Sequence, residues 1–183
     1  LAQDLRVPVM AHPVALTPYW KEMQRAKATV LRAEISMLLD TTICIGRFVR
    51  YGVYDRFPEV NFLFCQLGGT IPFLFGRFDF MKTKYTSCPE QTVEGEAVFP
   101  LKSLRDYKGR ILADCHSMDR VAIECAAESL GADCIVVGGD YPISAWQLSL
   151  VYNLQEIRQT RLSAADKEKI LGGNAARIFG LDG

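Results

Sequence analysis

The chain has 183 residues, which is enough for one domain with its own hydrophobic core. Its 21 basic and 21 acidic side chains cancel, so the composition gives no broad charged surface for nucleic acid or for a membrane and favours a small-molecule partner. The apolar runs are too short to cross a bilayer and no secretory signal is recognisable, so we expect a cytoplasmic protein.

The first predicted strand comes early in the chain. Residues 6–13, RVPVMAHP, form a β-rich run bounded by prolines, which predicts a buried strand that ends near His12. A long, mostly helical stretch follows and continues until DRFP at residues 55–58. Its apolar residues recur at steps of three and four, so we expect them to share one buried helix face: Ile35, Leu38, Leu39, Ile43, Phe48 and Val49.

The second strand and its helix follow directly. VNFLFCQLGG at residues 60–69 predicts a strand that breaks at a glycine pair. TIPFLFGRFDFMKTKY at residues 70–85 predicts a helix with Pro72 near its first turn, where a missing N–H costs little. The polar interval at residues 86–100 predicts a loop insertion over one end of the fold.

Two more strand–helix units complete the pattern. GRILADCH at residues 109–116 predicts a third strand, and DCIVVGGDYP at residues 133–142 predicts a fourth that is followed by a helix over residues 144–160. A last helix begins at Ser163, an N-cap with an acidic residue three positions on. The helix between the third and fourth strands ends at Gly131 and has one apolar side: Val121, Ala122, Cys125, Ala126 and Leu130.

Four strands separated by helices, with nearly continuous apolar runs, predict a parallel α/β sheet in a single domain over residues 1–183. Such a sheet either lies open with helices on both faces or closes into a barrel. In both cases active residues gather at the carboxyl ends of the strands. The residues at these ends are His12, Gln66, Asp114, His116 and Asp140.

Imidazole and carboxylate groups at strand ends suggest a metal site, because they are suitable ligands for Zn²⁺ and similar ions. Each also has a structural alternative. His12 could bond a loop carbonyl, His116 could be a rim residue, and Asp114 or Asp140 could cap a helix or turn. The arginines at positions 47, 50 and 77 could equally be solvated or paired with acidic side chains.

The order of four motifs is similar to that of a known family. VMAHP, YGVYDRFPEVNFLFCQLGGTIPFLFGRFDF, GGDYP and LSAADKEKILGGNAARIFGL resemble the carboxyl-terminal part of the amidohydrolase-related proteins typified by aminocarboxymuconate semialdehyde decarboxylase. The likeness runs over nearly the whole chain. It implies a distorted (β/α)₈ TIM-like barrel, of which this chain looks like the second half, strands five to eight with their helices.

The resemblance also implies roles for four residues. His12 and Asp140 fall on metal ligands, and Arg77 falls on an arginine that contacts the substrate carboxylate. Gln66 falls on a histidine that acts as general acid/base in the family. A carboxamide can orient water or substrate but cannot shuttle a proton, so Asp140 is an alternative proton-handling group.

A second departure from the family concerns the metal. The family's first strand supplies a His-x-His pair, and the chain contains no such pair. We therefore expect that an upstream half is missing from this sequence, which opens on Leu1 rather than Met. Unpaired strand edges in a half-barrel are expected to recruit the missing strands or to aggregate.

Two functions follow as alternatives. The first is a metal-dependent decarboxylase, or a hydrolase of the same family, that acts on a small carboxylated substrate with a divalent metal, Zn²⁺ or alternatively Mn²⁺. The second is a catalytically silent homologue that serves as a binding or structural subunit, which Gln66 and the missing histidine pair favour. The resemblance also implies a homodimer, because in the decarboxylase an arginine reaches the neighbouring subunit's site.

Overall fold

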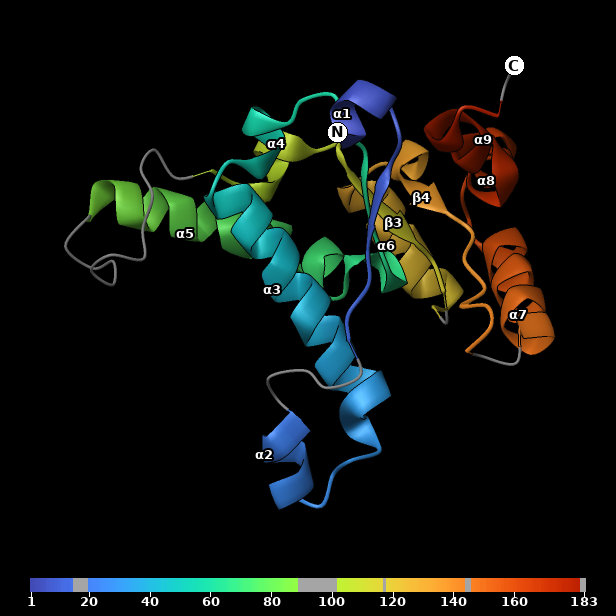
Figure 1. Cartoon of the computed structure of the whole chain (residues 1–183), viewed down its shortest axis with the longest axis horizontal. Helices are drawn as coiled ribbons and strands as arrows, with labels where there is room; N and C mark the ends of the chain where they lie inside the picture. Colours follow the sequence, from blue (N-terminus) through green and yellow to red (C-terminus); the bar gives the residue numbers. More distant parts are fainter. Residues whose placement is uncertain (15–19, 89–101, 117, 144–145, 182–183) are drawn as a thin grey trace.

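The computed structural model describes residues 1–14, 20–88, 102–116, 118–143 and 146–181. Its centre is a four-stranded parallel sheet with the strands in chain order (Figure 1). The strands are β1 (Val9–Ala11), β2 (Phe62–Phe64), β3 (Ile111–Asp114) and β4 (Ile135–Val136). The prediction of a parallel α/β arrangement with four strands is confirmed.

The register of the sheet aligns the carboxyl ends of its strands. Ala11 of β1 lies opposite Phe64 of β2, and Phe64 lies opposite Ala113 of β3. Asp114 then pairs with Val136 of β4. Residues that follow the strands therefore emerge at one edge of the sheet.

Helices connect the strands and cover the sheet. Three of them, α3, α5 and α6, lie between consecutive strands, and the carboxyl-terminal helices follow β4 (Figure 1). The helices and helical turns are α1 (Ala2–Leu5), α2 (Trp20–Arg25), η1 (Arg32–Ser36), α3 (Met37–Arg50), α4 (Val53–Arg56), η2 (Gln66–Gly68), η3 (Ile71–Leu74), α5 (Phe75–Ser87), η5 (Leu104–Tyr107), α6 (Arg120–Ser129), η6 (Ala132–Cys134), α7 (Trp146–Gln159), α8 (Ala164–Glu168), η7 (Lys169–Gly173) and α9 (Asn174–Phe179). Pro72 lies in the first turn of η3, as predicted.

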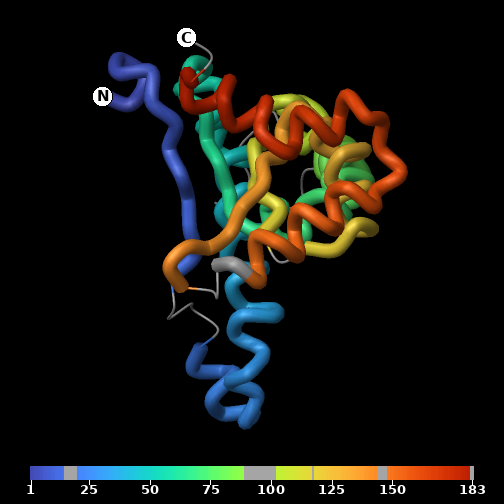
Figure 2. Tube along the Cα trace, turned by 90° about the vertical axis from the view of Figure 1, so that its right-hand side faces the viewer, coloured from blue at the N-terminus to red at the C-terminus, as the bar shows by residue number. Residues whose placement is uncertain are grey.

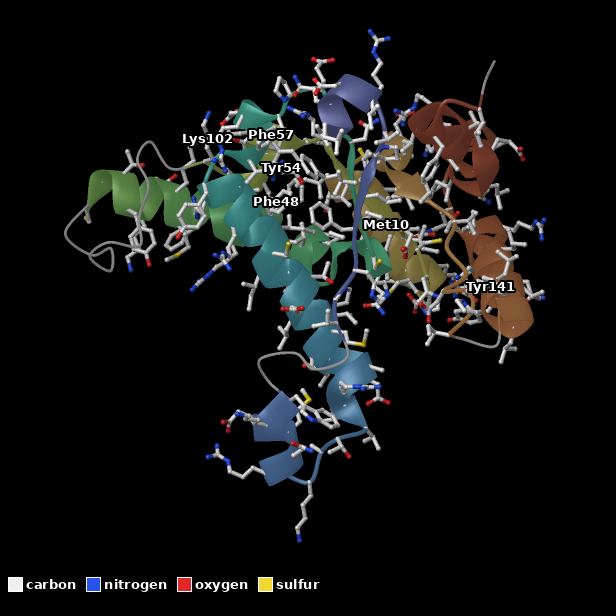
Figure 3. The ribbon with its side chains drawn as sticks, in the orientation of Figure 1. Met10, Phe48, Tyr54, Phe57, Lys102 and Tyr141 are labelled. Atoms are coloured by element: carbon white, nitrogen blue, oxygen red, sulfur yellow. The ribbon has the colours of Figure 1, made fainter. Side chains whose placement is uncertain are left out.

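The core forms between the sheet and these helices. Phe48 of α3 packs edge-on against Phe62 and Phe64 of β2, with ring centroids 5.0 and 5.4 Å apart. Tyr54 of α4 continues this aromatic cluster and is fully buried (Figure 3). Edge-to-face packing of this kind adds to the stability gained from burying the rings.

The predicted burial of the first strand was wrong, because none of the residues Val9–Ala11 is buried. Val9 is 37% exposed and Met10 is 58% exposed, because β1 is hydrogen-bonded only to β2 in the described sheet and so forms its edge. Met10 lies on the strand that crosses the front of the molecule in Figure 3. At the other end of the sheet, β4 pairs only with β3 among these residues.

Some predicted helix faces are rotated relative to the observed ones. In α6, Val121 is 61% exposed, whereas Ile123 and Ala126 are buried. In α3 the buried side chains are those of Thr41, Ile45 and Val49, and Ile43 is exposed. Both helices also carry apolar residues outside the buried face, so spacing alone did not select the correct one.

The helix boundaries differ little from the predicted ones. Ser163 caps α8 by accepting a hydrogen bond from the Asp166 N–H, as predicted. The α5 helix runs to Ser87, so the first two residues of the predicted loop at 86–100 are helical, and residues 89–100 lie outside the described part of the chain.

The outline of the molecule is uneven. The α2 helix and η1 project from the sheet-containing body, and both chain ends lie on the opposite side (Figures 1 and 2). No helix in the described ranges has the length and apolar character that a membrane crossing requires.

Candidate active site

A cavity of about 450 Å³ lies at the carboxyl ends of the strands. Each strand end contributes polar side chains to its wall: His12 after β1, Gln66 after β2, Asp114 and His116 from β3, and Asp140 after β4. Apolar side chains, including Met10, Leu63, Val136 and Phe179, form the rest of the wall. A concave site with a few convergent polar groups is the usual form of a small-molecule site.

His12 and Asp140 converge in this cavity. The Nε2 atom of His12 lies 3.8 Å from Oδ1 of Asp140, although 128 positions separate them in the chain. The Nδ1 atom of His12 lies 2.7 Å from the carbonyl oxygen of Pro13, to which it can only donate. The loop-carbonyl contact considered as an alternative is therefore present. This contact is compatible with metal binding by His12. With the proton of the neutral ring on Nδ1, the Nε2 atom has a lone pair that faces the Asp140 carboxylate.

The loop that carries Asp140 is closely fitted to the strand beside it. A Cβ atom on Gly138 would lie 2.9 Å from Cγ of Asp114, so a larger residue would push this carboxyl group away. The side chain of Asn153 in α7 is buried and donates to the carbonyl of Gly138. Asp140 itself has a φ of 52°, in the left-handed region. These contacts fix the direction from which its carboxylate enters the cavity.

Asp114 joins the ends of β2 and β3. It is 5% exposed, and its Oδ1 accepts hydrogen bonds from the backbone N–H groups of Gln66 at 2.9 Å and His116 at 3.0 Å. The alternative that Asp114 caps the following helix was wrong, because Asp119 caps α6 through the Ala122 N–H.

Gln66 lies at a break in the backbone. Both Gln66 and Leu67 have φ values near 55°, and the two glycines that follow also have positive φ. Such conformations in residues other than glycine are uncommon and often occur at functional sites. The side-chain Oε1 of Gln66 is buried and has no hydrogen-bond partner among the described residues. The amide therefore offers an acceptor at the cavity wall.

His116 was among the strand-end residues in the sequence, but no role in the site was assigned to it. It was considered as a rim residue, but it is only 7% exposed and lines the cavity. Its Nε2 lies 3.6 Å from Oδ2 of Asp140, and its Nδ1 lies 3.0 Å from Oγ of Ser149 in α7. Its spacing of two residues from Asp114 was the available signal, because residues i and i+2 of an extended segment point to the same side.

Arg77 does not reach this cavity in its own chain. It is exposed in the first turn of α5 and is absent from the cavity wall. Arg47 is also exposed, whereas Arg50 donates to the carbonyl of Lys102 and lies over the ring of Phe78. No lysine or arginine of the described residues lines the cavity.

Two cysteines near the site are unsuited to nucleophilic chemistry. Burial, and then the nearby Asp114 carboxylate, raises the pKa of Cys65 to about 12. Burial similarly raises the pKa of Cys115 to about 12. Both thiols stay protonated at neutral pH, and the thiolate is the reactive form.

The donors present do not form a complete metal site by themselves. Within the described ranges, no group of three or more His, Cys, Asp or Glu side chains is placed to hold a metal ion. His12 and Asp140 provide two donors of suitable type, and a catalytic zinc usually has three protein ligands. Further ligands would have to come from outside the described residues.

Comparison with known proteins gives a consistent result. A family model described as Amidohydrolase matches residues 1–181. The 2-amino-3-carboxymuconate-6-semialdehyde decarboxylase of Dictyostelium discoideum is 27% identical over 151 residues, which are 81% of this chain and 39% of that protein. The chain therefore spans well under half of this relative.

Two solved structures have a similar fold. The 2,6-dihydroxybenzoate decarboxylase from Rhizobium, also solved with 2,6-dihydroxybenzoate, has a TM-score of 0.78 and 20% identity, and the match covers 100% of this chain and 54% of that one. The 5-carboxyvanillate decarboxylase from Novosphingobium aromaticivorans, complexed with manganese and 4-hydroxy-3-methoxy-5-nitrobenzoic acid, has a TM-score of 0.80 and 19% identity, with coverages of 98% and 49%.

Proposed function

Since this chain belongs to the amidohydrolase family, we propose that it is part of a metal-dependent decarboxylase that acts on a small carboxylated substrate. The observation that carries the proposal is the convergence of His12 Nε2 and Asp140 Oδ1 at 3.8 Å in the cavity at the strand ends. A lone pair that faces a carboxylate is unfavourable unless a positive centre, either a proton or a metal cation, lies between them. A divalent cation would supply that centre.

We propose that the four strands are strands five to eight of a (β/α)₈ barrel. The matched share of the two solved structures, 54% and 49%, supports a partial barrel. The outer edge of β1 has no neighbouring strand among the described residues and is a place where a further strand would pair. The remaining metal ligands, including a His-x-His pair, would then come from residues outside this chain.

The metal would be held by His12, Asp140 and these external ligands. A divalent cation, when bound, would act as a Lewis acid on a substrate oxygen. Zn²⁺ and Mn²⁺ both accept imidazole and carboxylate ligands, and the Novosphingobium structure contains manganese. The proposal therefore covers both ions.

Gln66 and Asp140 differ in what they can contribute to the reaction. Decarboxylation breaks a carbon–carbon bond, releases CO₂ and leaves a carbon that must accept a proton. The amide of Gln66 can orient substrate or water by hydrogen bonds but has no proton to exchange. Asp140 is the group of this pair whose chemistry allows proton transfer, so we assign it a second, proton-handling role.

We also propose that the protein is a homodimer in which Arg77 serves the cavity of the second copy. Arg77 is exposed on α5 and does not line its own cavity. Its planar guanidinium is well suited to a substrate carboxylate. Delivery from a second copy would reconcile this chemistry with its position.

The catalytically silent alternative has little support. The relatives reported above are all named as decarboxylases, which also favours carbon–carbon bond cleavage over hydrolysis. Two observations still favour it: Gln66 stands in place of a proton-shuttling histidine, and this chain has no His-x-His pair.

The test uses the complete reading frame that contains this chain. Metal content is measured by mass spectrometry, and CO₂ release is measured with 2,6-dihydroxybenzoate and 5-carboxyvanillate. We expect about one metal ion per chain, and we expect His12→Ala and Asp140→Asn to lose both metal and CO₂ release. Asp119→Asn, at the N-cap of α6, is the control. A metal-free protein that chelators leave unaffected would contradict the proposal.

A further inference from the structure

The cavity lacks the cationic side chains that usually receive a carboxylate. No lysine or arginine of the described residues lines it, and two aspartates, Asp114 and Asp140, do. A carboxylate that leaves water needs hydrogen-bond donors to replace its hydration. If the protein acts on a carboxylated substrate, as proposed above, Arg77 of a second copy would contribute from outside this wall, and a group of the wall itself can supply a further donor.

His116 is placed to be that donor. Its side chain lines the cavity and is 9% exposed, and its Nε2 lies 3.6 Å from Oδ2 of Asp140. Its backbone N–H is bound by the buried carboxylate of Asp114 at 3.0 Å. The imidazole is therefore anchored at its base and aimed at the place where His12 and Asp140 meet.

Ser149 can set the protonation pattern of this ring. Its Oγ lies 3.0 Å from Nδ1 of His116. A serine hydroxyl that donates to Nδ1 makes Nε2 the protonated nitrogen of the neutral ring. His12 has the opposite arrangement, because its Nδ1 donates to the Pro13 carbonyl and leaves Nε2 as an acceptor. With the Ser149 hydroxyl as the donor, Nε2 of His12 can bind a cation and the Nε2–H of His116 can bind an anion.

The other polar groups of the wall are less suitable. The Gln66 side chain offers a buried acceptor oxygen without a partner among the described residues, and its NH2 group is a neutral donor with no contact that orients it toward a carboxylate. The side chain of Cys65 contacts Asp114, and burial keeps its thiol protonated. Arg77 is exposed on α5, away from the cavity of its own chain.

We propose that His116 is a substrate-binding residue whose Nε2–H donates a hydrogen bond to the carboxylate of the bound acid, and that Ser149 is a positioning residue that holds the required tautomer. This inference rests on the proposed function, because it assumes a carboxylated ligand. It adds a role for a residue two positions after β3, next to the strand end where Gln66 occupies the position that the family's pattern gives to histidine.

The experiment compares two ligands that differ only in the carboxylate. Binding of 2,6-dihydroxybenzoate and of resorcinol, its ring without the carboxylate, is measured by calorimetry on the Mn²⁺-loaded protein from the complete reading frame. His116→Gln and His116→Met are matched in size, and only glutamine keeps a donor near the Nε2 position. Ser149→Ala is compared with Ser87→Ala, an exposed helical serine of α5. Thermal unfolding verifies that each variant is folded.

We expect His116→Met to weaken binding of 2,6-dihydroxybenzoate about tenfold to a hundredfold and to leave resorcinol binding within about threefold, because a hydrogen bond to a charged group is lost. His116→Gln should retain most of the affinity, and Ser149→Ala should show a smaller loss in the same direction. This inference alone would be overturned if the wild-type protein binds the acid and His116→Met loses equal affinity for both ligands, or loses none. A wild-type protein that binds neither this acid nor 5-carboxyvanillate would overturn the proposed function and this inference with it.

Discussion

Asp114 at the end of β3 lies directly against Gly138 in the loop after β4. A Cβ atom on Gly138 would be 2.9 Å from Cγ and 3.0 Å from Cβ of Asp114. Asp114 also accepts hydrogen bonds from the backbone N–H groups of Gln66 and His116. A single buried carboxylate therefore contacts the segments that follow β2, β3 and β4. The geometry of the cavity depends on this contact.

The first prediction concerns Gly138→Ala. The added methyl group would displace Asp114 or the loop that carries Asp140, and overpacking of this kind lowers the free energy of unfolding by about 1–3 kcal/mol. Urea unfolding measures the loss, and metal affinity should fall with it. Gly139→Ala is the matched control, because its Cβ would meet only Leu150 at 3.8 Å, an ordinary contact. Equal behaviour of the two variants would show that the contact is unimportant.

The second prediction concerns the buried carboxylate itself. Asp114→Ala leaves the N–H groups of Gln66 and His116 without their acceptor, and each unpaired group should cost about 1–3 kcal/mol in the free energy of unfolding. Asp114→Asn keeps a carbonyl acceptor and should cost less. The Asp119→Ala control removes only the cap of α6, for about 0.5–2 kcal/mol. An Asp114→Ala protein as stable as the wild type would show that these two hydrogen bonds do not stabilise the strand ends.

The third prediction concerns thiol reactivity and pH. Because the pKa of Cys65 and of Cys115 is raised to about 12, iodoacetamide at pH 8 should modify the exposed Cys125 first and leave these two intact, as peptide mass spectrometry can show. The unfolded chain releases these protons near the ordinary value of 9.0 while the folded chain retains them. The contribution to stability is therefore complete below about pH 9 and is lost as the pH rises toward 12. Early labelling of Cys65 would contradict this.

The fourth prediction concerns Gln66→His. An imidazole at the end of β2 restores a group that can exchange protons near neutral pH, so the rate of CO₂ release should rise by up to about 10²–10⁴-fold if proton transfer limits it. Gln66→Asn is the control: it changes the side chain without adding a proton-exchanging group, and asparagine tolerates the left-handed backbone conformation at this position. If neither variant changes the rate and neither binds substrate, the silent alternative regains its support.

The fifth prediction concerns Arg77 and the proposed dimer. Arg77→Ala and Asp140→Asn should each abolish activity in a homodimer. When the two variants are mixed and allowed to exchange subunits, a hybrid contains one cavity with both native groups, so up to about a quarter of the wild-type activity should return. Sedimentation measures the oligomeric state of each preparation. A mixture that remains inactive although hybrids form would show that Arg77 acts elsewhere.

Much of the fold could be predicted from the sequence because its signals are local. The apolar runs around Phe62–Phe64 and Ile111–Asp114 are typical of buried parallel strands, and both strands lie where they were expected. The N-cap at Ser163 is also a local signal. The burial of β1 was mispredicted because it depends on which strands lie beside it, which composition does not encode.

The site was predictable in part for the same reason. The strand-end rule selected His12, Gln66, Asp114, His116 and Asp140, and the structure brings all five to one cavity. The proposed role of His116 depends on its 3.0 Å contact with Ser149, which lies 33 positions later in α7. No local sequence pattern predicts such a contact. The position of Arg77 relative to the cavity likewise follows from the path of α5 and not from its motif.

The open edge of β1 has a practical consequence for anyone who prepares this polypeptide. Its outer backbone groups have no neighbouring strand among the residues described, and Val9 and Met10 add apolar side chains to it. At β4, by contrast, the Ile135 carbonyl accepts from the Asn174 side chain and the Val137 N–H donates to the Ile170 carbonyl. An open edge pairs readily with the same edge of a second molecule. Produced by itself, the segment should therefore become turbid with rising concentration, and co-production with the remainder of a barrel should keep it clear.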